Sequence, residues 1–394
     1  MLRTLCAPTS AQQVRAFARS PGQLARFGLT LRPPVQVGPV GSPEGVAWRR
    51  YPRSGPRPGA PYHERVTTTA PRTPAPAPAP SRVGRLVRWL PLPSEATLRR
   101  LAVASLVTQA GIIVTGGAVR LTDSGLGCPD WPHCTQGSLT ATPEMGLHGA
   151  IEFGNRLLTF VLGAVALAML VAVIRTFDSD RPRRDLLVPA AFLLGFIPAQ
   201  AVIGGITVWT DLNPWVVMFH FLVSTVLVGV ATVMVRRAQR PMGAVPERVG
   251  QPWLQRLGLL TLAATAAVIY LGAVVTGSGP HAGDPDSKRT GLDVAVVTQV
   301  HADAVLVLVG LSIGLYFTAR ALGSPGRSAR AAAVLLVVEA AQGVVGFVQY
   351  RLELPELLVG LHMLGAALMV VAAVDGWLAT RWLPSDRSVP QPAR

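Results

Sequence analysis

The chain has few charged residues for its length. Of its 394 residues, 14% are charged and 50% are hydrophobic, and the mean hydropathy is +0.40, whereas soluble domains carry about 25% charged residues. The N-terminal segment lacks an apolar core followed by a small-residue cleavage site, so no secretory signal is expected. An aspartate-rich motif that could bind magnesium and diphosphate is also missing. Asp178 and Asp180 are close in sequence, but they lie among arginines and do not form such a motif. An ordinary soluble globule and a membrane prenyltransferase are therefore both disfavoured.

The positive charge is concentrated at the N-terminus. Residues 1–100 contain 16 Arg and 3 Glu, a net charge of +13, whereas the other 294 residues contain 20 basic and 18 acidic groups, a net charge of +2. Seventeen of the 34 prolines also lie in residues 1–100. This composition predicts a disordered, Pro/Arg-rich cytoplasmic tail over residues 1–98; the alternative is that translation begins near Val83. The nearly neutral remainder predicts no nucleic-acid partner.

The rest of the chain is dominated by long apolar stretches. A membrane-spanning helix needs about 20 mostly apolar residues, and eight stretches meet this requirement. The sequence therefore predicts an all-α polytopic membrane protein with eight transmembrane helices. The stretches are 99–121, 146–174, 186–208, 215–235, 254–276, 293–319, 329–350 and 356–380.

Arginine is distributed unevenly between the connections. Connections 2–3, 4–5 and 6–7, with their flanking residues and the C-terminal tail, hold 15 Arg, whereas the other four connections hold only four basic residues. The excess of basic residues on the cytoplasmic side of membrane proteins then predicts that both termini are cytoplasmic.

The membrane region also contains a repeat. The segment from Gln200 to His220 overlays the segment from Gln342 to His362 without a gap, and Gln and His match at its two ends. Four spans per half predict two parallel four-helix repeats related by an axis along the membrane normal. The expected divisions are an N-terminal half at 99–236, a linker at 237–252, a C-terminal half at 253–380 and a cytoplasmic tail at 381–394.

Four histidines lie on the even-numbered spans, in the half of the membrane that is expected to be outermost. They are His148, His220, His301 and His362. A single intramembrane histidine can serve only as a hydrogen-bond donor between helices, but four on alternate helices favour metal ligation. No carboxylate or thiolate accompanies His301 and His362, so a haem, which needs only axial ligands, fits better than a bare ion.

Span 2 differs from its repeat partner by one carboxylate. His148, Glu152 and Asn155 lie within about 60° of one another on one stripe of a helix. Glu152 has no counterpart in span 6. A carboxylate within a membrane is energetically costly, so its presence indicates a function. We therefore interpret Glu152 as catalytic, the alternative being a packing salt bridge to Arg156.

The connection between spans 1 and 2 contains Cys128 and Cys134. On the oxidising side of the membrane, these two cysteines favour a disulfide bond. A zinc site with His133 is the alternative, but it lacks ligands, and adjacent His133 and Cys134 are poorly spaced for tetrahedral coordination.

Residues 122–134, the stretch 152–156 and the histidines of spans 4, 6 and 8 together resemble the haem A synthase family. The resemblance covers residues 99–380 and is closest to an actinobacterial-type variant, with Asn155 where many members have a histidine. It implies an oxidoreductase that converts the C8 methyl group of haem O to a formyl group, giving haem A for cytochrome c oxidase. The haem O synthase and an electron carrier are the expected partners.

The family's functional residues can be transferred to this chain where its motifs match. The resemblance implies a haem b held by His301 and His362, a catalytic Glu152, a substrate haem at His220 near Asn155 and Arg156, and a disulfide between Cys128 and Cys134. The second ligand of the substrate haem is either His148 or absent. Two other functions stay open: a di-haem b-type cytochrome that only passes electrons, and a haem transporter.

Overall fold

The structure is a computed structural model that describes residues 89–244, 251–322 and 326–381. All of these belong to one unit, Pro76–Arg394. Most of the predicted N-terminal tail, part of the predicted linker and nearly all of the predicted C-terminal tail lie outside the described residues. Those described form eight long helices, α2 (Glu95–Leu121), α3 (Gly146–Arg175), α4 (Arg184–Trp209), α5 (Pro214–Ala238), α6 (Pro252–Ser278), α7 (Val294–Ala321), α8 (Gly326–Arg351) and α9 (Glu356–Arg381).

Each of these helices is long and apolar enough to cross a membrane. The all-helical, eight-span prediction is therefore confirmed. Several helices begin at a capping side chain that satisfies backbone N–H groups of the first turn. Ser94 caps α2, Asn213 caps α5 and Asp293 caps α7. Pro214 follows Asn213 at the first helical position, where its missing N–H is not needed.

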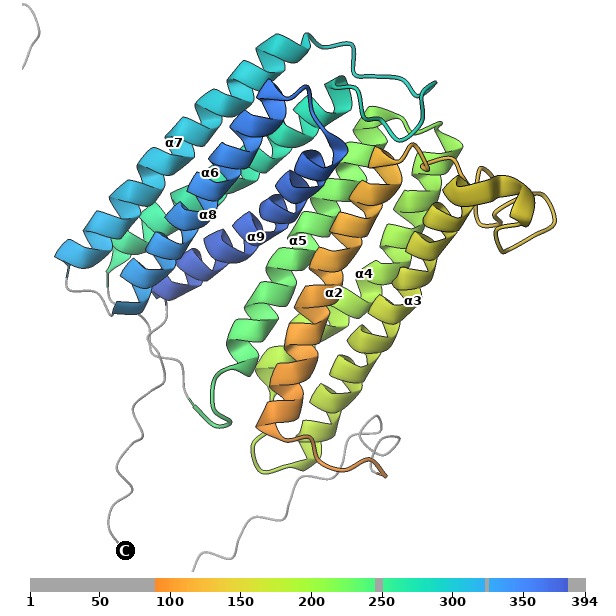
Figure 1. The fold of residues 1–394 in the computed structure, drawn as a ribbon. Coiled ribbons are helices and arrows are strands. Elements are labelled where there is room, and N and C mark those ends of the chain that lie inside the picture. Colours follow the sequence, from red (N-terminus) through yellow and green to blue (C-terminus); the bar gives the residue numbers. More distant parts are fainter. Residues whose placement is uncertain (1–88, 245–250, 323–325, 382–394) are drawn as a thin grey trace, which may run out of the picture. The chain divides into compact units, whose positions relative to one another are not determined.

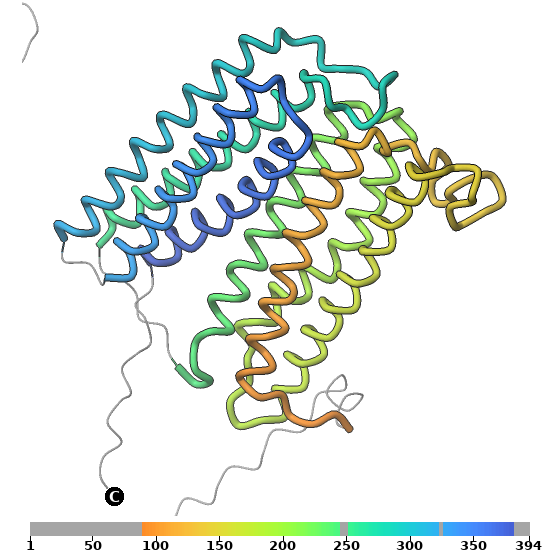
Figure 2. Tube along the Cα trace, in the orientation of Figure 1, coloured from red at the N-terminus to blue at the C-terminus, as the bar shows by residue number. Residues whose placement is uncertain are grey.

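The helices form two groups of four. Within the first group, α2 contacts α3 and α5, and α4 contacts α3 and α5; within the second, α6 contacts α7 and α9, and α8 contacts α7 and α9. The groups meet where α9 packs against α2 and α5, and where α5 packs against α6. Figure 2 shows the same arrangement as a continuous trace.

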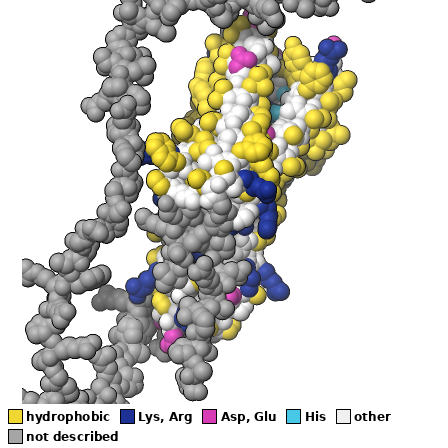
Figure 3. Space-filling model, turned by 90° about the vertical axis from the view of Figure 1, so that its left-hand side faces the viewer, with side chains coloured by type: hydrophobic (Ala, Val, Ile, Leu, Met, Phe, Trp, Pro, Cys, Tyr) yellow, Lys and Arg dark blue, Asp and Glu magenta, His cyan; other side chains and the backbone are white. Residues whose placement is uncertain are grey.

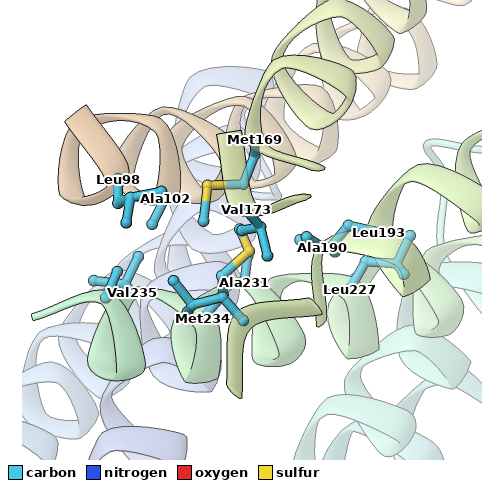
Figure 4. Packing of buried hydrophobic residues seen from close by; sticks show 12 residues of the cluster. Leu98, Ala102, Met169, Val173, Ala190, Leu193, Leu227, Ala231, Met234 and Val235 are labelled. Atoms are coloured by element: carbon cyan, nitrogen blue, oxygen red, sulfur yellow. The ribbon is translucent and has the colours of Figure 1, made fainter. Parts of the chain in front are cut away.

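The first group has a dense apolar core at the end where α2 begins. Leu98 of α2, Met169 of α3, Leu193 of α4 and Met234 of α5 are almost completely buried there and belong to one cluster. Figure 4 shows these side chains converging from all four helices. Burying apolar side chains of this size excludes space for a cofactor at this end.

The opposite end carries four connections, which we call the disulfide end: residues 122–145, 210–213, 279–293 and 352–355. Hydrogen bonds link these connections. Between the two groups, the Gly125 N–H donates to the Gly283 carbonyl at 2.8 Å; within the second group, His281 Nε2 lies 2.9 Å from the Leu354 carbonyl oxygen. The sides of the helices are largely hydrophobic (Figure 3), as expected for surfaces that face lipid.

The repeated Gln and His residues make the same contact in both groups. Gln200 Nε2 donates to the His220 carbonyl at 3.2 Å, and Gln342 Nε2 donates to the His362 carbonyl at 2.9 Å. The same contact thus joins α4 to α5 in the first group and α8 to α9 in the second. The repeated Gln and His residues therefore have the same structural role in both groups.

Candidate functional site

Three of the predicted histidines rest against a glycine of the preceding helix. A Cβ added to Gly204 would lie 3.4 Å from His220 Cε1, one added to Gly272 would lie 3.1 Å from His301 Cε1, and one added to Gly346 would lie 3.3 Å from His362 Cε1. The absence of a side chain at each glycine lets the imidazole ring lie close to the neighbouring helix backbone. These glycine seats were not predicted from the sequence.

Each of these imidazoles has one enclosed and one accessible nitrogen. Nδ1 of His220, His301 and His362 is buried and makes no hydrogen bond of good geometry with the described residues. Nε2 is neither enclosed nor hydrogen-bonded there, and none of the three residues is fully buried. Histidine atoms are visible between hydrophobic side chains in Figure 3. A neutral imidazole with a free Nε2 is a good ligand for iron.

His301 lies on α7 and His362 on α9, so the two histidines belong to alternate helices of the second group. The helices around them bury no side chains at the disulfide end. Residues 294–307 of α7, 340–351 of α8 and 356–366 of α9 include no buried residue, although buried residues follow or precede each segment. The side chains around these two histidines are therefore exposed or half-buried at the disulfide end, whereas the same helices bury side chains farther from it.

The donor set fits a haem better than a bare ion. Within the described parts of the chain, no three His, Cys, Asp or Glu side chains are grouped so that they could hold a metal ion. A haem supplies four equatorial nitrogens and needs only the axial imidazoles. His301 and His362 have accessible Nε2 atoms and glycine seats that hold their rings, so they fit this group.

The first group of helices places its site residues differently. Asn155, which occupies the position corresponding to His301, accepts a 2.7 Å hydrogen bond from the Thr115 hydroxyl of α2. His148 is exposed near the start of α3, and its Nδ1 lies 3.0 Å from the Ser124 hydroxyl oxygen. No contact among the described residues joins either side chain to His220, so the second ligand of a haem at His220 stays a prediction.

Glu152 is buried, with only 6% of its surface exposed, and its carboxylate has three donors. Oε2 accepts from the Cys128 backbone N–H at 2.6 Å, while Oε1 accepts from Arg156 Nη2 at 2.5 Å and from Arg156 Nε at 3.1 Å. Arg156 also donates to the carbonyls of Cys128 at 2.7 Å and His133 at 2.9 Å. The predicted alternative salt bridge is therefore present, and it ties the connection 122–145 to α3.

The two loop cysteines form a disulfide bond, as predicted. The loop they close packs onto α4, where the Trp131 ring occupies the space beside Gly205 and meets Trp209 edge-on at 5.1 Å. Trp209 Nε1 donates to the Trp131 carbonyl at 2.9 Å. The loop thus covers the disulfide end of the first group of helices.

Residues 99–283 match the COX15-CtaA family of cytochrome oxidase assembly proteins. The chain is also 32% identical over 188 residues to the haem A synthase of Lysinibacillus sphaericus, covering 45% of this chain and 57% of that protein. It is 29% identical over 187 residues to the haem A synthase of Exiguobacterium sibiricum, covering 45% and 59%. The haem A synthase of Shewanella oneidensis is 29% identical over 183 residues, covering 43% and 53%.

These matches thus span little more than half the length of the curated relatives. The COX15-CtaA match includes Cys128, Cys134, Glu152 and His220 but ends before His301. The assignment of the second group of helices therefore depends on the repeat and on its own geometry.

Proposed function

We propose that this protein is a haem A synthase, which oxidises the C8 methyl group of haem O to a formyl group and so supplies haem A for cytochrome c oxidase biogenesis. The observation that favours this activity is an asymmetry between two otherwise similar halves. Both halves seat histidines against glycines, but only the first has a buried carboxylate, Glu152, on the helix that corresponds to the His301 helix; the buried carboxylate of the second half, Glu339, lies on α8 and accepts from the Ser312 hydroxyl at 2.6 Å. An electron-transferring di-haem cytochrome or a haem transporter would need the histidines but not that carboxylate.

The second group of helices would hold the resident cofactor. His301 and His362 would be the axial ligands of a haem b through their accessible Nε2 atoms. A haem b at this position would supply one-electron redox chemistry next to the substrate half. The glycine seats keep each imidazole in a fixed orientation.

The first group of helices would bind haem O. His220 would be its firm iron ligand, with Asn155 and Arg156 near the bound substrate. His148 would be the second ligand only if the haem lies closer to the disulfide end than in the other half, because His148 is seven residues, about 10 Å, from Asn155 along the helix. An iron with one protein ligand would suit a substrate that must enter and leave.

Glu152 would stabilise positive charge that develops at the substrate methyl carbon during oxidation. Electrostatic stabilisation of this kind is strong where water is excluded, because the effective dielectric constant is low. Arg156 and the Cys128 amide hold the carboxylate in one orientation, and the disulfide loop would limit the entry of water.

The protein would be a cell-membrane protein with its disulfide end on the outer face and both termini in the cytoplasm. The distribution of arginine between the connections supports this orientation. The haem O synthase, which makes the substrate, and an electron carrier are the proposed partners.

The function is tested by expressing the full chain in a host that makes haem O but no haem A, followed by pyridine haemochrome analysis. We expect haem A with the wild-type protein, and haem O without haem A in the Glu152→Gln variant. Bound haem b without any haem A in the wild type would instead favour the di-haem cytochrome.

The ligand assignments are tested on purified variants. Replacement of His301 or His362 with alanine should abolish the six-coordinate b-type spectrum while the protein still inserts into the membrane. Haem O binding is then compared between His148→Ala and His220→Ala. Loss of binding in both variants supports a ligand pair, whereas an unchanged His148→Ala spectrum leaves His220 as the only histidine ligand. Retention of the b-type spectrum in both His301→Ala and His362→Ala would place the cofactor elsewhere.

A further inference from the structure

Two arginines from different halves of the chain lie together at the disulfide end. Arg120, in the last turn of α2, donates through Nε to the His281 carbonyl and through Nη2 to the Thr276 carbonyl at 2.8 Å. Arg289 donates through Nη2 to the Pro280 carbonyl at 2.6 Å. The two guanidinium groups are thus anchored to the carbonyls of consecutive residues, Pro280 and His281, and their positive charges repel each other.

Neither guanidinium forms an ion pair with a residue that the structure describes. All ion pairs among the described residues use other arginines, and Arg289 otherwise donates only to the Ser287 carbonyl. The last-turn carbonyls of α6 offset part of the charge of Arg120. Arg120 is half-buried, and its Nη1 makes no hydrogen bond with a described residue. Two cations at the edge of an apolar region, with donors to spare, call for an anion.

The position of the arginine pair points to one particular anion. Thr276, which anchors Arg120, lies one helical turn, about 6 Å, beyond Gly272 on the same face of α6. Gly272 is the residue against which the His301 ring rests. Arg120 is therefore anchored about one helical turn from the seat of His301, on its disulfide-end side, and Arg289 is anchored to the residue before His281, to which Arg120 also donates.

We infer that Arg120 and Arg289 bind the propionate carboxylates of the haem held by His301 and His362. Guanidinium groups match carboxylates in geometry and form strong, charge-assisted hydrogen bonds with them. Arg120 belongs to the first half of the chain, so this contact would make haem binding in the second half depend on the first. The inference rests on the haem site in the proposed function, but not on the oxidation of haem O.

The test compares haemin with haemin dimethyl ester, whose carboxylates are blocked. Full-length protein carrying His220→Ala, so that the first half lacks its histidine ligand, is purified without haem and titrated with each compound while the Soret band is recorded. We expect Arg120 and Arg289 to favour haemin over its ester by about ten-fold, because hydrogen bonds to charged groups contribute this much or more.

Arg120→Gln and Arg289→Gln should each reduce that preference, mainly by weakening haemin binding and leaving ester binding unchanged. The matched control is Lys288→Gln, which removes one positive charge from an exposed neighbour in the same connection. If Lys288→Gln keeps the parent protein's preference for haemin over its ester, the effect is specific to Arg120 and Arg289. An equal weakening of haemin and ester binding would show that the arginines only hold the connections together, and would overturn the inference.

Two further outcomes distinguish propionate binding from the binding of another anion and from the proposed function. An equal affinity of the parent protein for haemin and its ester would overturn it even if an arginine variant failed to fold, and would leave the pair to another anion such as a lipid phosphate. If the preference is found but no haem A forms in the co-expression experiment, the carboxylate site stands and the proposed function fails.

Discussion

Glu152 and Arg156 offer a test that separates chemistry from loop anchoring. In Glu152→Gln, the amide oxygen can still accept from the Cys128 N–H, but the two charged bonds to Arg156 are lost. Losing a charge-assisted bond costs about 1.5–3 kcal/mol. We expect the lower end, because the Arg156 side chain is 22% exposed and keeps two carbonyl partners.

The converse change should disturb the loop more. Arg156→Gln leaves Glu152 buried without its ion-pair partner, and breaking a buried pair from one side costs about 3–5 kcal/mol. It also removes the two bonds from Arg156 to the loop carbonyls. The free energy of loop opening should therefore fall by about 1.5 kcal/mol in Glu152→Gln and by more in Arg156→Gln.

The assay measures loop opening and product formation on the same preparations. Loop opening is followed by the rate at which dithiothreitol reduces the Cys128–Cys134 disulfide; about 1.4 kcal/mol corresponds to a ten-fold faster reduction. Haem A is measured by pyridine haemochrome analysis. If Glu152 is catalytic, Glu152→Gln abolishes haem A with the smaller loop effect, whereas Arg156→Gln keeps some haem A with the larger one.

The control is Asp178→Asn, which breaks the 3.0 Å pair with Arg175 at the opposite end of α3. It should change neither the reduction rate nor the haem A yield. A loss of haem A in both site variants, in proportion to their loop opening, would contradict a catalytic Glu152, because the residue would then act only by anchoring the loop.

Two further predictions concern the disulfide and a glycine seat. Thiol labelling of Cys128 and Cys134 should require reductant, because the two sulfurs are bonded; equal labelling with and without reductant rules the bond out. Gly346→Ala should alter the b-type spectrum, since the new Cβ would lie 3.3 Å from His362 Cε1, whereas Gly343→Ala on the same helix meets nothing within 4 Å. Both changes raise helix propensity equally, by about 1 kcal/mol, so only the contact with His362 distinguishes them. A spectral change in both variants, or in neither, would contradict a specific role of Gly346 in seating His362.

Much of the helical framework could be predicted from the sequence. Eight apolar stretches predict eight spans, because a backbone in a bilayer must satisfy its hydrogen bonds locally. The ends were less predictable: the first span was expected at residue 99, but α2 begins at Glu95, where Ser94 provides the cap. Polar caps extend helices beyond the apolar stretch that identifies them.

The site was predictable only in part. The histidines and Glu152 could be singled out because polar groups are rare in membrane spans. Their surroundings could not. Nothing local indicates that Gly272 seats His301 or that Asn155 accepts from Thr115, because such contacts depend on how neighbouring helices rotate and approach.

The number and approximate extent of the helices, the internal repeat and the alternate placement of the histidines follow from local physics and can be read along the chain. Which side chains contact one another depends on the packing of the helices. Only packing brings the Cys128 amide to Glu152 and the guanidinium of Arg120 to Thr276, which is 156 positions away. The physical reason is that burial and hydrogen bonding are satisfied between distant segments, so the pairing of these groups follows from the packing of whole helices and not from any one of them.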